Sequence, residues 1–117
     1  MLVVMKTLAL VLALIAVPAL AAADAPTHVI NDGGATLTLD CADGGRVLVN
    51  GADNTITTTG GCAKVVVNGS GNHVAIEAAD KIVVTGSNNA VTYKKGWNKK
   101  SPKVARLGVG NTIAKVK

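Results

Sequence analysis

The sequence predicts an all-β protein, a short parallel β-solenoid of about five coils, from three observations. A Gly-x-x-Asn motif occurs four times at nearly constant spacing, starting at Gly51, Gly69, Gly86 and Gly108. Runs of Val and Ile lie between the motifs, as is typical of strands. The chain has no Phe, one Tyr and one Trp, so its core must be largely aliphatic. One repeat could not bury an apolar face alone, whereas stacked repeats cover one another.

Residues 1–23 have the pattern of a cleavable signal peptide, followed by one domain over residues 24–117. Lys6 is the only charge within this segment, and an apolar stretch follows it. Alanines then supply an A-x-A cleavage site, with cleavage after Ala23 favoured over cleavage after Ala21. An uncleaved membrane anchor is the alternative, although the apolar run is somewhat short for one. We therefore expect a bacterial protein that is exported to the periplasm or secreted.

Each repeat contains two strand-like pieces whose alternate residues point inward. One piece follows the Asn of the motif, and its inward positions are Ile56, Thr58, Val74, Ile76, Val91 and Tyr93. The other precedes the next Gly, and its inward positions are Val47, Val49, Val65, Val67, Ile82 and Val84. A degenerate copy of the repeat begins at Gly33. A small β-sandwich is the alternative fold.

The motif asparagines are expected to fall at one position in successive coils. They are Asn54, Asn72, Asn89 and Asn111. Stacked amides can hydrogen-bond to one another along the axis, which predicts an Asn ladder. The general preference of Asn and Gly for turns explains one such motif but not four in register.

Three segments resemble the bacterial family known as domain of unknown function 3060. They are residues 67–74, 82–93 and 107–113, and the similarity covers most of residues 45–114. The resemblance implies a secreted or envelope-associated β-repeat domain. It implies no activity, because none is attached to the family.

Cys41 and Cys62 are the only cysteines, and in an exported chain they predict a disulfide. They fall near the same corner of adjacent coils, a separation that suits the Cα distance of a disulfide. Two buried free thiols are the alternative. Without adjacent histidines, the pair makes a poor zinc site.

The charge of the chain is uneven, and its most basic segment is an insertion that lengthens the last repeat. Residues 24–80 hold seven acidic and two basic residues, whereas residues 81–117 hold nine basic residues and no acidic one. The residues proposed to bind an anionic surface are Lys94, Lys95, Trp97, Lys99, Lys100 and Lys103. We expect a protruding loop whose lysines attract anionic lipid or acidic polysaccharide and whose Trp stacks on a sugar or lies at a membrane interface. The alternative is a solvated loop whose Trp caps the side of the stack.

Other chemistry receives little support from the sequence. The acidic residues lie at or near turns, and nothing marks two of them as a catalytic pair. Threonines at Thr55 and Thr57 resemble the ranks of ice-binding solenoids, but His73 and Ala75 interrupt them in the next coil. The glycine-rich calcium-binding nonapeptide is absent from the sequence. We therefore expect no catalytic, cofactor-binding or metal-binding residues, and no nucleic-acid partner for an exported protein.

Two functional hypotheses follow. The first is a non-enzymatic exported protein that binds an anionic envelope component, lipid or polysaccharide, through the basic loop. The second is a purely structural or stress-related periplasmic protein with no specific ligand. Either would be a monomer or weakly self-associating, because Lys115 takes an inward position in the last strand and would penalise the addition of a further coil.

Overall fold

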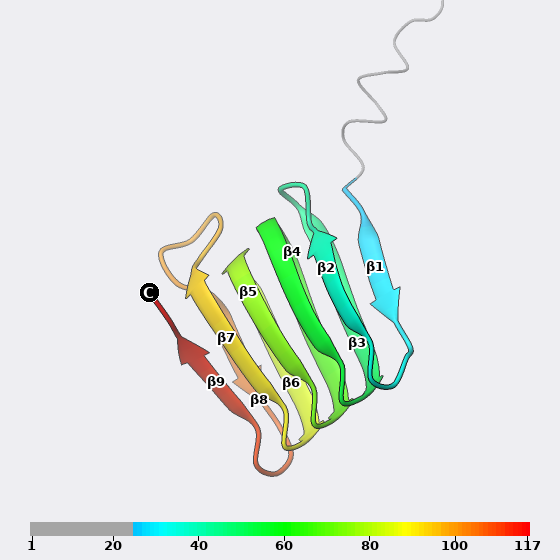
Figure 1. Ribbon diagram of the computed structural model, residues 1–117. Helices are drawn as coiled ribbons and strands as arrows, with labels where there is room; N and C mark the ends of the chain where they lie inside the picture. The colour runs from blue at the N-terminus through cyan, green and yellow to red at the C-terminus, as the bar shows by residue number, and fades with distance from the viewer. Residues whose placement is uncertain (1–24) are drawn as a thin grey trace, which may run out of the picture.

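A computed structural model describes residues 25–117, which form nine strands and no helix. The strands are β1 (Thr27–Ile30), β2 (Thr36–Asp40), β3 (Gly45–Ala52), β4 (Thr55–Ser70), β5 (His73–Ala79), β6 (Lys81–Ser87), β7 (Ala90–Lys95), β8 (Lys103–Arg106) and β9 (Thr112–Lys115). All pairings between these strands are parallel. The strands wind into a stack of about five coils (Figure 1), which confirms the predicted β-solenoid. The proposed signal peptide, residues 1–23, lies outside the described residues.

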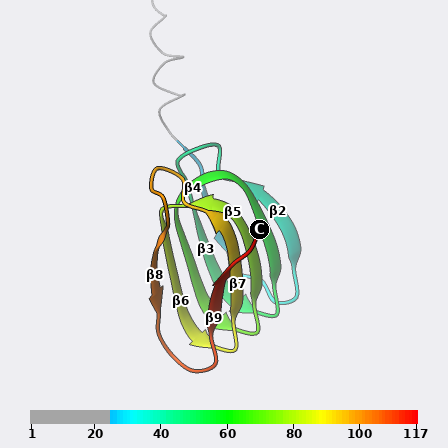
Figure 2. The same ribbon diagram turned by 90° about the vertical axis from the view of Figure 1, so that its left-hand side faces the viewer.

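The stack has two broad faces, which Figure 2 shows nearly edge-on. The β5 face consists of β2, the first half of β4, β5, β7 and β9, and the β6 face consists of β1, β3, the second half of β4, β6 and β8. Strand β4 belongs to both because it continues around a corner, where its register with β5 shifts between Thr58 and Gly61. Each coil therefore contributes one strand segment to each face.

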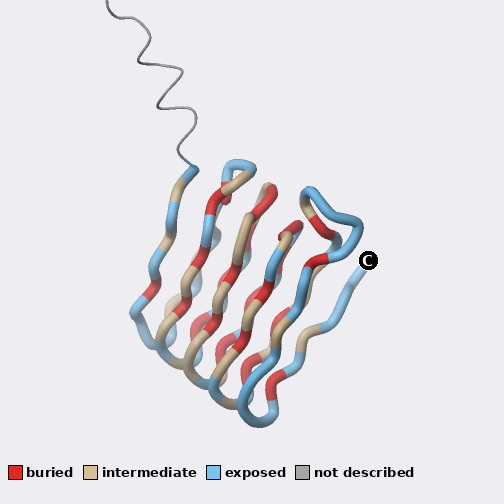
Figure 3. Tube along the Cα trace, turned by 180° about the vertical axis from the view of Figure 1, so that it is seen from behind, coloured by how far each residue is buried: buried red, intermediate tan, exposed pale blue. Residues whose placement is uncertain are grey.

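The aliphatic side chains between the two faces form the core, and burial alternates along the strands (Figure 3). All the predicted inward positions are buried except Tyr93, which is partly buried and packs against the core. Thr58 differs from the aliphatic residues at these inward positions in being polar, and its buried hydroxyl has no hydrogen-bond partner within residues 25–117. The alternation of the sequence therefore assigned the two sides of each strand correctly.

The predicted Asn ladder is present and joins each coil to its neighbours. The Asn72 side chain accepts hydrogen bonds from the backbone N–H of Asn54 at 3.0 Å and from Asn54 Nδ2 at 3.1 Å. Asn72 Nδ2 in turn donates to Asn89 Oδ1 and to the carbonyl oxygen of Gly51, both at 3.0 Å. The same pattern links Asn89 to Asn111. These amides are buried away from water, so the ladder supplies the hydrogen bonds that water would make to an exposed amide.

The motif glycines are required because successive coils come very close together at these positions. A Cβ added to Gly69 would lie 1.8 Å from the carbonyl oxygen of Gly51, and one added to Gly86 would lie 1.9 Å from that of Gly69. Both glycines also have positive φ, at 131° and 111°. The backbone at this column comes too close to the preceding coil for any side chain.

The first coil is out of register with the repeat predicted from Gly33. Gly33 pairs with Ala52 rather than with Gly51, and Ala35 takes the ladder position by donating its N–H to Asn54 Oδ1 at 2.9 Å. The carbonyl of Asp32 replaces that of a motif glycine and accepts from Asn54 Nδ2 at 2.7 Å. The prediction was wrong by one residue because the first coil is one residue longer than the second.

The predicted disulfide joins Cys41 to Cys62, whose Cα atoms are 5.1 Å apart. Cys41 follows β2 and Cys62 lies in β4 just past its corner, so the bond ties adjacent coils together. Both residues are fully buried. By restricting the unfolded chain, a loop of this length contributes about 3 kcal/mol in the chain-entropy treatment.

The last coil leaves an open end with two charged residues at inward positions. Arg106 pairs with the buried Val84, and Lys115 pairs with Tyr93. Both side chains are exposed, because no coil among residues 25–117 covers them. A charge at each of these positions disfavours the pairing of another strand at the open edge.

We predict that Asn72→Ala destabilises the fold by about 1–3 kcal/mol, because it leaves the buried donors of Asn54 and the carbonyl acceptor of Gly51 without their hydrogen-bond partner. Asn98→Ala is the control, since Asn98 is exposed in the loop and should be near neutral. Chemical denaturation of both variants measures the difference. Equal losses of stability would contradict the role of the ladder.

We predict that Arg106→Val combined with Lys115→Val promotes end-to-end association of folded monomers. The substitutions extend the apolar core to the open edge without changing a buried contact. Lys99→Val with Lys100→Val is the matched control, because it removes two charges away from the edge. Light scattering at increasing concentration measures the mass, and an unchanged mass for the edge variant would refute the prediction.

Candidate functional site

The basic insertion links β7 to β8 at one corner of the stack, where Figure 1 shows it as a loop beyond the tip of β7. It is fixed to the preceding coil through Asp80. The backbone N–H groups of Trp97 and Asn98 both donate to Asp80 Oδ1, at 3.2 Å and 2.6 Å. The N–H of Lys103 donates to the carbonyl oxygen of Asp80 at 2.8 Å. One residue thus holds the middle and the end of the loop.

Trp97 folds back onto the corners of earlier coils rather than pointing into solvent. A Cβ added to Gly61 would lie 2.0 Å from Cδ1 of Trp97, so the indole ring rests directly on that glycine. A Cβ added to Gly44 would lie 3.5 Å from Cη2, at the far side of the ring. The centre of the loop is therefore held against the stack by the indole ring. Because Gly44 and Gly61 have no side chains, the ring can cover the corner beside the disulfide.

The lysines of the loop remain exposed on this anchored segment. All five proposed binding lysines are exposed: Lys94, Lys95, Lys99, Lys100 and Lys103. Trp97 is partly buried, and its packing on Gly61 corresponds to the capping role given above as the alternative. The structure thus separates the proposed site into an exposed cationic part and a packed aromatic part.

Two regular columns on the outside of the β6 face were not recognised as surfaces from the sequence. The first is basic and consists of Arg46, Lys64, Lys81 and Lys103. The second is an amide column in which Asn68 Nδ2 donates to Asn50 Oδ1 at 3.1 Å and Asn50 Nδ2 donates to Asn31 Oδ1 at 3.0 Å. Thr85 continues it by donating its hydroxyl to Asn68 Oδ1. The amide column could have been predicted from the sequence, because each amide or hydroxyl residue directly precedes a turn at the repeat spacing.

The carboxylates near the corners serve the backbone of the turns. Asp43 accepts a hydrogen bond from the N–H of Gly61 at 2.9 Å, and Glu77 accepts one from the N–H of Gly60 at 3.0 Å. Asp40 likewise accepts one from the N–H of Ala42 at 2.8 Å. Within residues 25–117, no three His, Cys, Asp or Glu side chains are grouped so that they could hold a metal ion.

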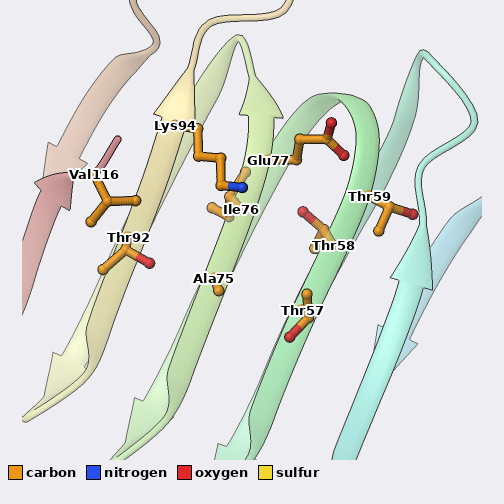
Figure 4. A pocket seen from close by; sticks show the side chains of 9 residues that line it. All are labelled: Thr57, Thr58, Thr59, Ala75, Ile76, Glu77, Thr92, Lys94 and Val116. Carbon is orange, nitrogen blue, oxygen red and sulfur yellow. The ribbon is translucent and has the colours of Figure 1, made fainter.

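Figure 4 shows a shallow hollow on the outside of the β5 face. Its volume is about 170 Å³, and Thr57, Ala75 and Thr92 line it from paired positions of neighbouring strands. Glu77 and Lys94 stand at its upper side (Figure 4). The hollow exists because small alanines and threonines alternate along the column, which confirms that the threonine ranks are interrupted.

These features define a class of protein: a disulfide-linked parallel β-solenoid with a buried Asn ladder and a basic loop at one corner. Residues 49–110 match the family described as Protein of unknown function (DUF3060), and the chain belongs to this family. This agrees with the resemblance seen in the repeats. No curated protein and no solved structure matches the chain. Over residues 25–117, no helix has the length and hydropathy needed to span a bilayer.

We predict that Gly61→Ala displaces Trp97 from the corner, because the added methyl group would overlap the indole ring. Trp97 is the only tryptophan, so its fluorescence emission should shift to longer wavelength as the ring becomes solvated. Gly33→Ala is the control, since its nearest neighbour would be 3.7 Å away. If both variants keep the wild-type emission, the indole does not rest on Gly61.

Proposed function

We propose that this chain is an exported, non-enzymatic protein that binds an anionic component of the bacterial envelope through its basic loop. The observation that carries the proposal is the anchored presentation of the lysines. Asp80 and the Trp97–Gly61 contact hold the loop backbone, while the side chains of Lys94, Lys99 and Lys100 extend into solvent. Fixed cations attract anions without the entropy cost of ordering the loop on binding.

Two further features support this assignment. The signal-peptide pattern of residues 1–23 favours export, and a disulfide between Cys41 and Cys62 suits an oxidising compartment. The carboxylates of Asp40, Asp43 and Glu77 are engaged with turn N–H groups, which favours a binding role over acid–base catalysis.

A purely structural or stress-related periplasmic role without a specific ligand is the second candidate. The observation that favours it is the commitment of Trp97 to packing, which removes the aromatic group most suited to stacking on a sugar. Binding measurements on the loop variants separate the two candidates.

We predict that replacing Lys94, Lys95, Lys99 and Lys100 by Gln weakens binding to anionic envelope material at least tenfold. Each lysine near an anionic surface contributes roughly 1 kcal/mol, and this contribution falls with ionic strength. Co-sedimentation with envelope fragments at low and high salt measures the effect. Thr36→Gln with Thr38→Gln, at exposed positions of β2 in the first coil, is the control, and equal binding by the wild type and the loop variant would contradict the proposal.

We predict that export removes residues 1–23, so that the exported protein begins at Asp24 or, less favourably, at Ala22. Mass spectrometry of protein recovered from the periplasm or medium identifies the first residue. An exported protein that retains Met1 would rule out cleavage.

A further inference from the structure

The basic column on the β6 face runs along the solenoid axis. Arg46 pairs in register with Lys64, and Lys81 pairs in register with Lys103. The pairing of β4 with β6 begins one residue after Lys64 and Lys81, so these two residues are also neighbours. Strand pairing spaces the four positions about 4.8 Å apart. Lys103 is the first residue of β8 and directly follows the loop, so the column and the loop form one continuous basic path.

Two more columns lie beside the basic one on the same face. Residues two positions further along each strand form an apolar column of Val29, Leu48, Val66, Val83 and Ala105. Two positions beyond lies the amide column of Asn31, Asn50, Asn68 and Thr85. Each column is about 6.6 Å from the next, since a strand advances by about 3.3 Å per residue. The face therefore has parallel basic, apolar and amide tracks.

No acidic residue in the strands of the β6 face balances the charge of the basic column. Strands β1, β3, β4, β6 and β8 contain no Asp or Glu. Like charges directly opposite one another on neighbouring strands destabilise a sheet, so the aligned cations of Arg46, Lys64, Lys81 and Lys103 repel. A linear polyanion lying along the axis would relieve this repulsion at several positions at once.

We propose that the β6 face binds a linear polysaccharide that carries carboxylate groups, with its chain parallel to the solenoid axis. Its carboxylates would contact the basic column, its ring C–H groups the apolar column, and its hydroxyls the amide column. This inference rests on the proposed function. It specifies the bound anion as a carboxylated polysaccharide, and it places the polysaccharide chain along the face from the loop at Lys103 toward Arg46. A bilayer fits less well, because the cations form a single row and Trp97 is packed rather than free to enter a membrane.

The test compares two variants that lose the same charge. The face variant carries Arg46→Gln, Lys64→Gln and Lys81→Gln, and the loop variant carries Lys94→Gln, Lys99→Gln and Lys100→Gln. Purified exported protein is titrated with polygalacturonate, with galacturonate trimers, with uncharged galactan, with polyphosphate, and with vesicles of phosphatidylglycerol and phosphatidylcholine. Thermal unfolding checks the fold, and the face variant should unfold no earlier than the wild type because its substitutions remove repulsion.

Wild type should bind polygalacturonate more tightly than the trimer, and the face variant should lose at least tenfold in affinity for the polymer and most of this length dependence. If the loop variant weakens but the face variant does not, this inference is wrong while the proposed function stands. If wild type binds none of the anionic probes, the proposed function fails. Binding to vesicles alone, or equal binding of polyphosphate and polygalacturonate, overturns the assignment to a carboxylated polysaccharide.

Discussion

The structure depends on the hydrogen bonds by which each ladder asparagine reaches the coils on both sides. Asn72 accepts from the main chain and side chain of Asn54, and donates to Asn89 and to Gly51. Its amide is therefore fully used inside a core that excludes water. A residue without both donor and acceptor groups would leave buried backbone groups unpaired, which costs more than the bonds themselves contribute. This requirement explains why the motif keeps Asn where other turns tolerate several residue types.

The glycine column follows from the same geometry. The carbonyl of Gly51 turns toward the next coil to accept from Asn72, and this brings it within 1.8 Å of where a Cβ of Gly69 would lie. The ladder and the close approach of the backbones are thus one constraint seen from two residues. Once both are met, every coil presents its remaining side chains at equivalent positions around the axis.

That equivalence turns a local repeat into surface columns. In the sequence, a basic residue precedes each apolar run, at Arg46, Lys64 and Lys81. Taken one at a time, these residues resemble ordinary solvated residues at the start of a strand. Parallel in-register stacking places them in one line with Lys103, and it does the same for Asn31, Asn50 and Asn68. A regular face suited to a regular polymer is therefore a direct consequence of the fold, while the loop adds charge at one end of it.

The sequence by itself determined the coil architecture, the inward residues, the Asn ladder and the disulfide, because these depend on alternation and on a nearly constant repeat that one chain displays. It misjudged the first coil by one residue. Register there is decided by the hydrogen bond that Ala35 N–H donates to Asn54 and by the one that the Asp32 carbonyl accepts from Asn54, and neither follows from the repeat. Only the tertiary structure decided the position of Trp97. The bare corners at Gly44 and Gly61 that receive its ring belong to earlier coils, and their distance from the loop along the chain hides the contact until the coils are stacked.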